Sequence, residues 1–141
     1  MDTILQWNLQ SYHTKFSELK IILNELNPLC ICLQETLIRT ANALPPAGYS
    51  ILHRPSDPQD GHNRGVAILI NNQCHYEEIN LNTNLQAIAA QLYIGKKYTV
   101  CSIYLPHQNV NKRELENLID SLPTPFLILG DMNAHGVLWG S

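Results

Sequence analysis

The sequence lacks any apolar stretch of membrane length, and its start lacks a signal-peptide layout, because Asp2, Gln6 and Asn8 interrupt the first apolar residues. It also lacks an excess of basic residues, since the 141 residues carry a formal net charge of -3 and have a pI near 6.0. The electrostatic pattern of broad nucleic-acid binding is therefore absent, and any contact with a polyanion must be local or metal-assisted. These absences predict an intracellular chain, in the nucleus and cytoplasm, with no membrane partner.

Cysteine is scarce, and its spacing is not that of a zinc site. None of the cysteines, Cys30, Cys32, Cys74 and Cys101, forms a C-x-x-C pair with a second cluster. Cys30 and Cys32 lie two residues apart in a predicted strand, so they share one face and cannot easily close on each other. We therefore expect buried, reduced thiols rather than a disulfide or a zinc site.

Internal repeats, low-complexity segments and linkers are also absent. The length of 141 residues, with 45% of them hydrophobic, is enough to bury one core. We interpret residues 1–141 as part of a single globular domain.

The start of the chain has the pattern of a strand, a helix and a second strand. Residues 3–8 alternate, with Ile4, Gln6 and Asn8 on one face. Residues 15–27 carry apolar side chains at helical spacing, which predicts an amphipathic helix that ends before Pro28. Residues 29–33 form an apolar run, as expected of a strand buried on both faces. This order predicts a parallel pair of strands with a right-handed crossover.

The middle of the chain has the pattern of an antiparallel run of strands. We expect an irregular connection at 36–48, a surface loop at 55–63, and strands at 49–54, 66–70, 76–81, 86–94 and 98–105. Asn111 and Glu114 form a plausible capping pair for a second helix, and a last strand covers 126–129. The fold class is therefore mixed α/β (α+β), with two helices.

Polar residues close several of these strands where the alternating pattern does not need them. Groups at strand ends converge on one rim of a layered sheet, so these residues are expected to face a common pocket. Acid and amide oxygens without a cysteine or histidine pair suit a hard cation, Mg²⁺ or Mn²⁺. The residues are Asn8, Glu35, Tyr104, Asp131 and Asn133.

Each of these residues also has an ordinary structural interpretation. Asp131 after Gly130 is typical of a turn, and Glu35 is equally suited to capping the following segment. Tyr104 fits an aromatic at the edge of the core with its hydroxyl in water. Asn8 fits a side chain that satisfies the backbone at a strand end. Order and context, rather than any single residue, favour a site.

That order resembles the endonuclease/exonuclease/phosphatase superfamily, the DNase I-like fold. The shared pieces are an Asn that closes the first strand, a Gln-Glu that closes the second, a Tyr-x-Pro and a Gly-Asp-x-Asn. Within the superfamily the chain is similar to the endonuclease domain of jockey-type non-LTR retrotransposons, whose polyproteins include a reverse transcriptase. The residues that carry this likeness are 4–8 (ILQWN), 33–36 (LQET), 65–69 (GVAIL), 104–106 (YLP), 130–135 (GDMNAH) and 138–141 (LWGS).

The resemblance implies the N-terminal portion of a DNase I-like four-layer α/β sandwich with a mixed sheet. It also implies a Mg²⁺-dependent nuclease, a metal-binding hydrolase that nicks DNA beside a fused or neighbouring reverse transcriptase. Glu35 would be the principal metal ligand, and Asn8 would support the metal or the scissile phosphate. Asp131 would orient or deprotonate the attacking water, Asn133 would hold phosphate oxygens, and Tyr104 would donate towards charge developing on the phosphate.

The chain departs from the family pattern at three contact positions and at its end. Met132, Arg64 and His107 replace an aromatic, a Gly and a second Pro. A terminal Ser-Asp-His-type motif, whose Asp and His complete the family site, does not occur in these residues, and none of the six histidines fills its role. We therefore expect a domain incomplete at its C-terminus, with weak or no nicking and a tendency to self-associate through exposed apolar surface.

Two other functions stay open at this point. One is a non-catalytic remnant of the domain that binds DNA or a protein, and the other is a small-molecule phosphatase of the same fold. DNA-binding contacts are expected at basic residues, although ordinary solvated charge explains each of them equally well. The basic residues are Arg64, Lys96, Lys97 and Arg113.

Overall fold

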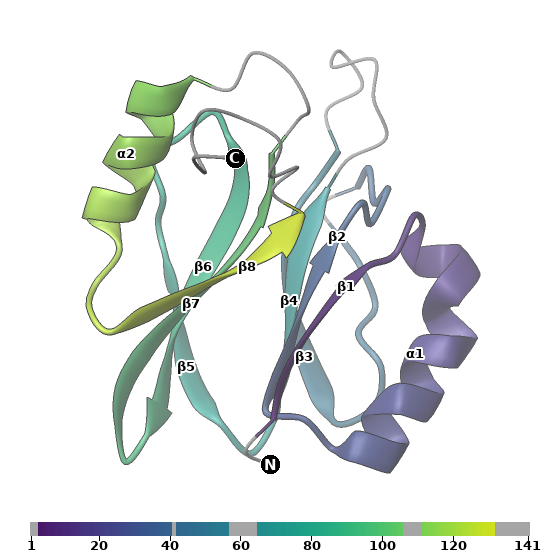
Figure 1. The fold of residues 1–141 in the computed structure, drawn as a ribbon. Coiled ribbons are helices and arrows are strands. Elements are labelled where there is room, and N and C mark those ends of the chain that lie inside the picture. The colour runs from purple at the N-terminus through teal and green to yellow at the C-terminus, as the bar shows by residue number, and fades with distance from the viewer. Residues whose placement is uncertain (1–2, 41, 57–64, 106–110, 132–141) are drawn as a thin grey trace.

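The computed structural model describes residues 3–40, 42–56, 65–105 and 111–131. Two four-stranded sheets face each other, and each carries one helix on its outer face (Figure 1). The elements are β1 (Ile4–Asn8), α1 (Tyr12–Leu26), β2 (Cys30–Gln34), β3 (Tyr49–Arg54), β4 (Val66–Asn71), β5 (His75–Ile79), β6 (Gln86–Ile94), β7 (Lys96–Tyr104), α2 (Lys112–Ser121) and β8 (Phe126–Asp131). No described helix is long and apolar enough to cross a membrane.

The first sheet has the order β1-β2-β4-β3, and its β1 and β2 are parallel, as the sequence predicts. The connecting helix α1 begins earlier than the predicted Lys15, because the Ser11 hydroxyl caps it by accepting a hydrogen bond from the Thr14 N–H at 3.2 Å. It ends at Asn27, whose left-handed conformation is common at helix C-termini. Leu19 and Leu23 are buried on its inner side.

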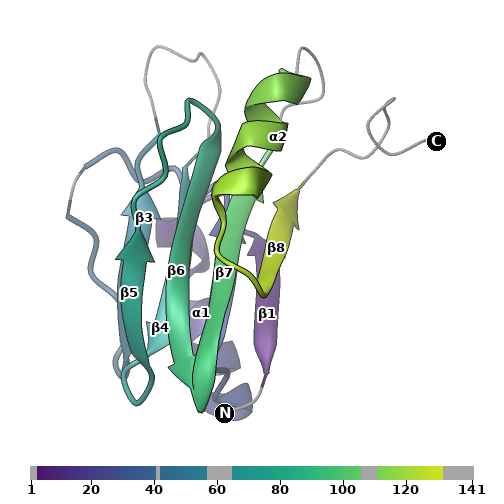
Figure 2. The same cartoon turned by 90° about the vertical axis from the view of Figure 1, so that its left-hand side faces the viewer.

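The second sheet has the order β5-β6-β7-β8, and α2 links β7 to its parallel neighbour β8 (Figure 2). The predicted capping residue is present, since Asn111 Oδ1 accepts a hydrogen bond from the Glu114 N–H at 3.1 Å. The antiparallel middle of the chain is confirmed strand by strand, but it is divided: β3 and β4 pair in the first sheet, whereas β5, β6 and β7 pair in the second. Alternation within strands carries no signal for that division.

Three apolar clusters separate the four layers. One lies between α1 and the first sheet, one lies between the two sheets, and one lies between the second sheet and α2. The predicted alternation of side chains along β1 is confirmed. Ile4 packs against the inter-sheet cluster, whereas Leu5 and Trp7 pack against the α1 cluster. All four cysteines are free and buried, as expected. The resulting architecture is the predicted four-layer α/β sandwich with mixed sheets and two helices.

Candidate functional site at the polar rim

The layer between the sheets changes from apolar to polar at the carboxyl ends of β1 and β2. Cys30, Cys32 and Val100 occupy its apolar part. Farther along the same strand faces, Gln34 replaces the apolar residue on β2, and Ser102 does so on β7. Strand alternation therefore directs several hydrogen-bonding side chains into the space between the sheets at this end.

Asn8 and Asp131 join the two sheets at this end. The Asn8 Nδ2 donates a hydrogen bond to Asp131 Oδ2 at 2.9 Å, although the two residues lie 123 positions apart in the sequence. The other amide atom, Oδ1 of Asn8, is buried and has no hydrogen-bond partner among the described residues. A buried acceptor without a partner is costly, so Oδ1 is suited to a ligand that the described residues do not supply.

Glu35 follows β2 directly, beside Asn8, because Gln34 is paired with Asn8 in the parallel ladder. Its backbone adopts a left-handed conformation, with φ at 51°, which is rare for a residue with a side chain. The surrounding backbone holds it there: the Ser11 N–H donates to the Glu35 carbonyl at 3.0 Å, and the Tyr12 N–H donates to the Thr36 carbonyl at 2.8 Å. The half-buried Glu35 is thus fixed by the loops that leave β1 and β2.

Tyr104 lies at the same end through the pairing of β7 with β8. It is the register partner of Asp131, and the Leu105 N–H donates to the Asp131 carbonyl at 2.9 Å. Its half-buried ring packs against the inter-sheet cluster, so it is on the face of β7 that looks towards the first sheet. Asn8, Glu35, Tyr104 and Asp131 together form what we call the polar rim.

A buried bridge lies directly beneath the polar rim. Gln34 Oε1 accepts a hydrogen bond from Gln6 Nε2 at 2.6 Å, and Gln34 Nε2 donates to the Ser102 hydroxyl at 3.0 Å. The same hydroxyl donates to the Leu33 carbonyl at 3.0 Å. Ser102 lies within the apolar run of β7, and its partners Gln34 and Leu33 are on the other sheet. The sequence alone therefore gives no sign of its role.

Gly65 supports the segment after Glu35. Its N–H donates to Gln86 Oε1 at 3.2 Å, and its carbonyl accepts from the Thr36 N–H at 3.1 Å. A side chain there would collide with the Thr36 hydroxyl, and a φ of 112° already favours glycine. Gln86 and Gly65 therefore tie the second sheet to the backbone beside Glu35.

The donor set of the polar rim fits a magnesium-like ion. It offers the carboxylates of Glu35 and Asp131 and the unpartnered Oδ1 of Asn8. Mg²⁺ is usually held by one or two carboxylates and keeps several waters, so a dense cage of protein ligands is not required. The described residues contain no group of three or more His, Cys, Asp or Glu side chains that could hold a metal.

The remaining predicted site residues either fall outside the described residues or lie away from the polar rim. Asn133 and Arg64 fall outside the described residues. Lys96 and Lys97 begin β7, roughly 25 Å along the strand from Tyr104, and Arg113 is exposed in the first turn of α2, on the outer side of the second sheet. Among the described residues, none of the expected DNA contacts joins the polar rim.

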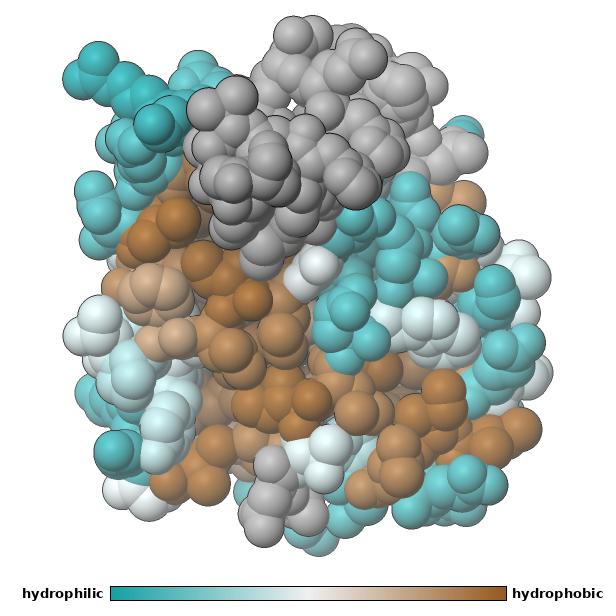
Figure 3. Space-filling view, viewed as in Figure 1, coloured by the Kyte–Doolittle hydropathy of each residue, from teal (hydrophilic) through white to brown (hydrophobic). Residues whose placement is uncertain are grey.

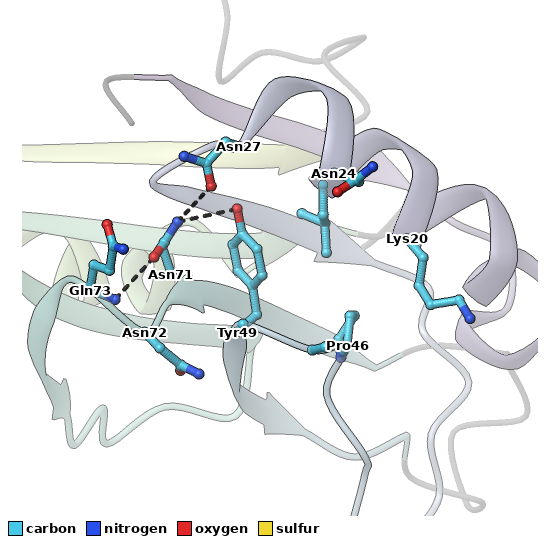
Figure 4. Close-up of a pocket in the computed structure, with 11 residues that line it drawn as sticks. Lys20, Asn24, Asn27, Pro46, Tyr49, Asn71, Asn72 and Gln73 are labelled. Carbon is cyan, nitrogen blue, oxygen red and sulfur yellow. Dashed lines mark hydrogen bonds between the residues drawn. The ribbon is translucent and has the colours of Figure 1, made fainter.

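A cavity of about 670 Å³ lies away from the polar rim (Figure 4). It lies between α1 and the turns beside Tyr49 and Asn71, and no carboxylate lines it. Its polar groups bond to one another: Asn71 Nδ2 donates to Asn27 Oδ1 at 3.1 Å, and Tyr49 donates to the Pro28 carbonyl at 2.7 Å. These hydrogen bonds stabilise this part of the fold, and no carboxylate lines the cavity to bind a metal or to act as an acid or base.

Comparisons with known proteins agree with this fold. The chain is 26% identical over 144 residues to a probable RNA-directed DNA polymerase from transposon X-element of Drosophila melanogaster, covering 98% of this chain and 16% of that protein. The endonuclease domain of TRAS1, a telomere-specific non-LTR retrotransposon, superposes with a TM-score of 0.73 at 21% identity, over 98% of this chain and 63% of that structure. The 3' phosphatase NExo from Neisseria, bound to product DNA hairpin, gives a TM-score of 0.65 at 19% identity, over 92% and 57%.

The chain thus spans less than two thirds of these relatives. Residues 5–141 match the Endonuclease/Exonuclease/phosphatase family, which covers nearly the whole chain. The chain therefore belongs to this family of phosphodiester hydrolases.

Proposed function

We propose that this chain is a Mg²⁺-dependent phosphodiesterase of the retrotransposon endonuclease type, which nicks DNA beside a reverse transcriptase in the nucleus or cytoplasm. The observation that carries the proposal is the Asn8–Asp131 hydrogen bond, which brings the ends of β1 and β8 together beside Glu35 and leaves Asn8 Oδ1 buried without a partner among the described residues. Similarity to the fold of the TRAS1 endonuclease domain supports the same proposed function.

Each residue of the polar rim has a proposed role. Glu35 and Asn8 Oδ1 hold the cation, which when bound neutralises phosphate charge and stabilises the leaving oxygen. Asp131, oriented by Asn8 Nδ2, accepts the proton of the attacking water. Tyr104 donates towards charge developing on the phosphate, and Asn133, outside the described residues, holds phosphate oxygens.

Metal binding tests the site directly. Mn²⁺ titration followed by electron paramagnetic resonance should show binding to the chain and a clear loss of affinity for Glu35→Gln, which removes the charge and keeps the shape. Glu25→Gln is the matched control, because Glu25 is exposed on α1, away from the polar rim. Equal Mn²⁺ affinity in all three proteins would refute the proposed site.

Activity is tested on supercoiled plasmid with Mg²⁺. We expect weak or no nicking, because the terminal Ser-Asp-His-type motif of the family does not occur in these residues. Whatever the rate, Glu35→Gln should remove it and Glu25→Gln should retain it. Cleavage of a chromogenic phosphomonoester in preference to plasmid would instead favour a phosphatase of the same fold.

An apolar surface favours a second function, binding without catalysis. Apolar residues gather around β8 and the gap beside β1 (Figure 3), where Ile94, Phe126 and Leu127 are 42%, 38% and 43% exposed. They line an apolar cavity of about 320 Å³ together with Ile4 and Tyr98. Sedimentation analysis distinguishes the two functions: association weakened by Phe126→Ser supports a binding role, and a monodisperse monomer opposes it.

A further inference from the structure

We propose that Ser102, on the opposite sheet, and Gln34, the residue that precedes Glu35 on β2, are positioning residues that set the orientation of Glu35. This inference rests on the proposed function, because it assigns Glu35 to a metal. It concerns side chains that are not assigned as ligands of the cation.

The bridge between the sheets is short and closed to solvent. Gln34 and Ser102 are both 0% exposed, although both are polar. The Ser102 hydroxyl accepts from Gln34 Nε2 at 3.0 Å and donates to the Leu33 carbonyl at 3.0 Å, so both hydrogen-bonding capacities of the hydroxyl are used. The Ser102 side chain of β7 therefore hydrogen-bonds to two consecutive residues of β2, Leu33 and Gln34.

Those two residues immediately precede Glu35. Beyond Gln34 the chain leaves the ladder, and Glu35 enters the left-handed region with φ at 51°. A residue held in a sparsely populated conformation needs support from its surroundings. The loops after β1 fix the Glu35 carbonyl, and the Ser102 bridge fixes the strand end from which the Glu35 side chain departs.

Stability alone does not explain the bridge. The buried neighbours of the bridge on these strand faces, Cys30, Cys32 and Val100, are apolar, and apolar pairs of matching shape can replace a buried hydrogen-bonded pair with little loss of stability. A hydrogen bond fixes the orientation of the two groups that it joins, whereas an apolar contact does not. Residues that orient metal ligands through hydrogen bonds commonly affect the affinity for the metal.

The test compares Mn²⁺ affinity, by electron paramagnetic resonance, with stability in urea. Ser102→Ala should weaken Mn²⁺ binding about tenfold, because Gln34 loses its anchor while Glu35 is unchanged. Thr99→Val is the matched control, since Thr99 is also buried on β7 and its Oγ1 has no partner among the described residues. It lies an odd number of positions from Ser102, on the opposite face of the strand, and should keep the wild-type affinity.

A double variant tests whether the two residues act as a unit. Gln34→Met removes the amide and keeps the length, so Gln34→Met combined with Ser102→Ala should lose no more affinity than the more affected single variant. Additive losses would overturn the shared role.

Two results separate this inference from the proposed function. If wild-type affinity persists in Ser102→Ala but falls in Glu35→Gln, the positioning role is wrong and the metal site stands. If Glu35→Gln also binds as the wild type does, the metal site itself fails. Should Ser102→Ala not fold, Ser102→Cys keeps the size with a weaker donor; reduced affinity there supports the role, and wild-type affinity overturns it.

Discussion

Gly130 lies close to the backbone of β7, one residue before Asp131. It is the register partner of Ile103, and a Cβ atom at Gly130 would overlap the Ile103 carbonyl. The obstruction is backbone, which cannot rotate away as a flexible side chain would. The glycine therefore lets β8 continue in the ladder to Asp131 and places that carboxylate opposite Tyr104.

Gly130→Ala should consequently destabilise the fold by about 3 kcal/mol, at the upper end of the usual range for overpacking. Urea unfolding measures the change. Gly48→Ala is the control, because Gly48 has a φ of 86° but nothing within 4 Å of an added Cβ, so only the conformational penalty of about 1 kcal/mol applies. Similar losses in the two variants would contradict the close-packing explanation.

Sequence reasoning identified Asp131 at the end of a strand but treated Gly130 as the stop. The structure shows that the strand passes through both residues, since β8 spans Phe126–Asp131. The reason is a contact with Ile103, far away in the sequence, which no local pattern records. Ser102 was missed for a related reason, because its importance arises from Gln34 on the other sheet.

At the scale of elements, Asn71 joins α1, β3 and β4 at the end of the first sheet opposite the polar rim. Its Nδ2 donates to Asn27 Oδ1 at 3.1 Å and approaches the Pro28 carbonyl and the Tyr49 hydroxyl, while its Oδ1 accepts from the Gln73 N–H at 3.0 Å. Asn71 itself is buried. One amide thus satisfies backbone and side-chain groups from three elements.

Asn71→Ala should lower the free energy of unfolding by about 2 to 3 kcal/mol, because it leaves buried groups without partners. Chemical denaturation checks this value. Asn24→Ala is a fitting control: Asn24 lines the same cavity from α1 but is exposed, and alanine favours helix, so the change should be neutral or slightly stabilising. An Asn71→Ala protein as stable as the Asn24→Ala protein would show that the bonds contribute little.

Elements with strong local signals were the most predictable. The strands β3, β4 and β6, the cap of α2 and the parallel β1–β2 pair follow from period, turn residues and capping. The early start of α1 at Tyr12 and the division of the middle strands between two sheets did not follow. The division between the sheets depends on tertiary contacts. The start of α1 combines the local Ser11 cap with a tertiary hydrogen bond from the Tyr12 N–H to the Thr36 carbonyl.

At the scale of the whole molecule, the sandwich buries thiols between layers where the charged form is unfavourable. Burial raises the pKa of Cys101 from 9.0 to about 12. A side-chain hydrogen bond with Cys30, together with burial, raises the pKa of Cys32 well above 9.0. These thiols keep their protons in the folded state over a pH range in which the unfolded chain releases them.

Stability should therefore be pH-dependent on the alkaline side. Because the unfolded chain binds fewer protons than the folded one above pH 9, the free energy of unfolding is at its full value below pH 9 and falls as the pH rises towards about 12. Urea unfolding at several pH values across that range measures the slope. Cys101→Ala lowers stability through the cavity it creates, but its slope should be shallower, because one of the protected protons is gone. An unchanged slope in Cys101→Ala would show that the thiol buried between β7 and α2 does not couple protonation to folding. The loss of stability at alkaline pH would then have to come from other groups with raised pKa values, such as Tyr12.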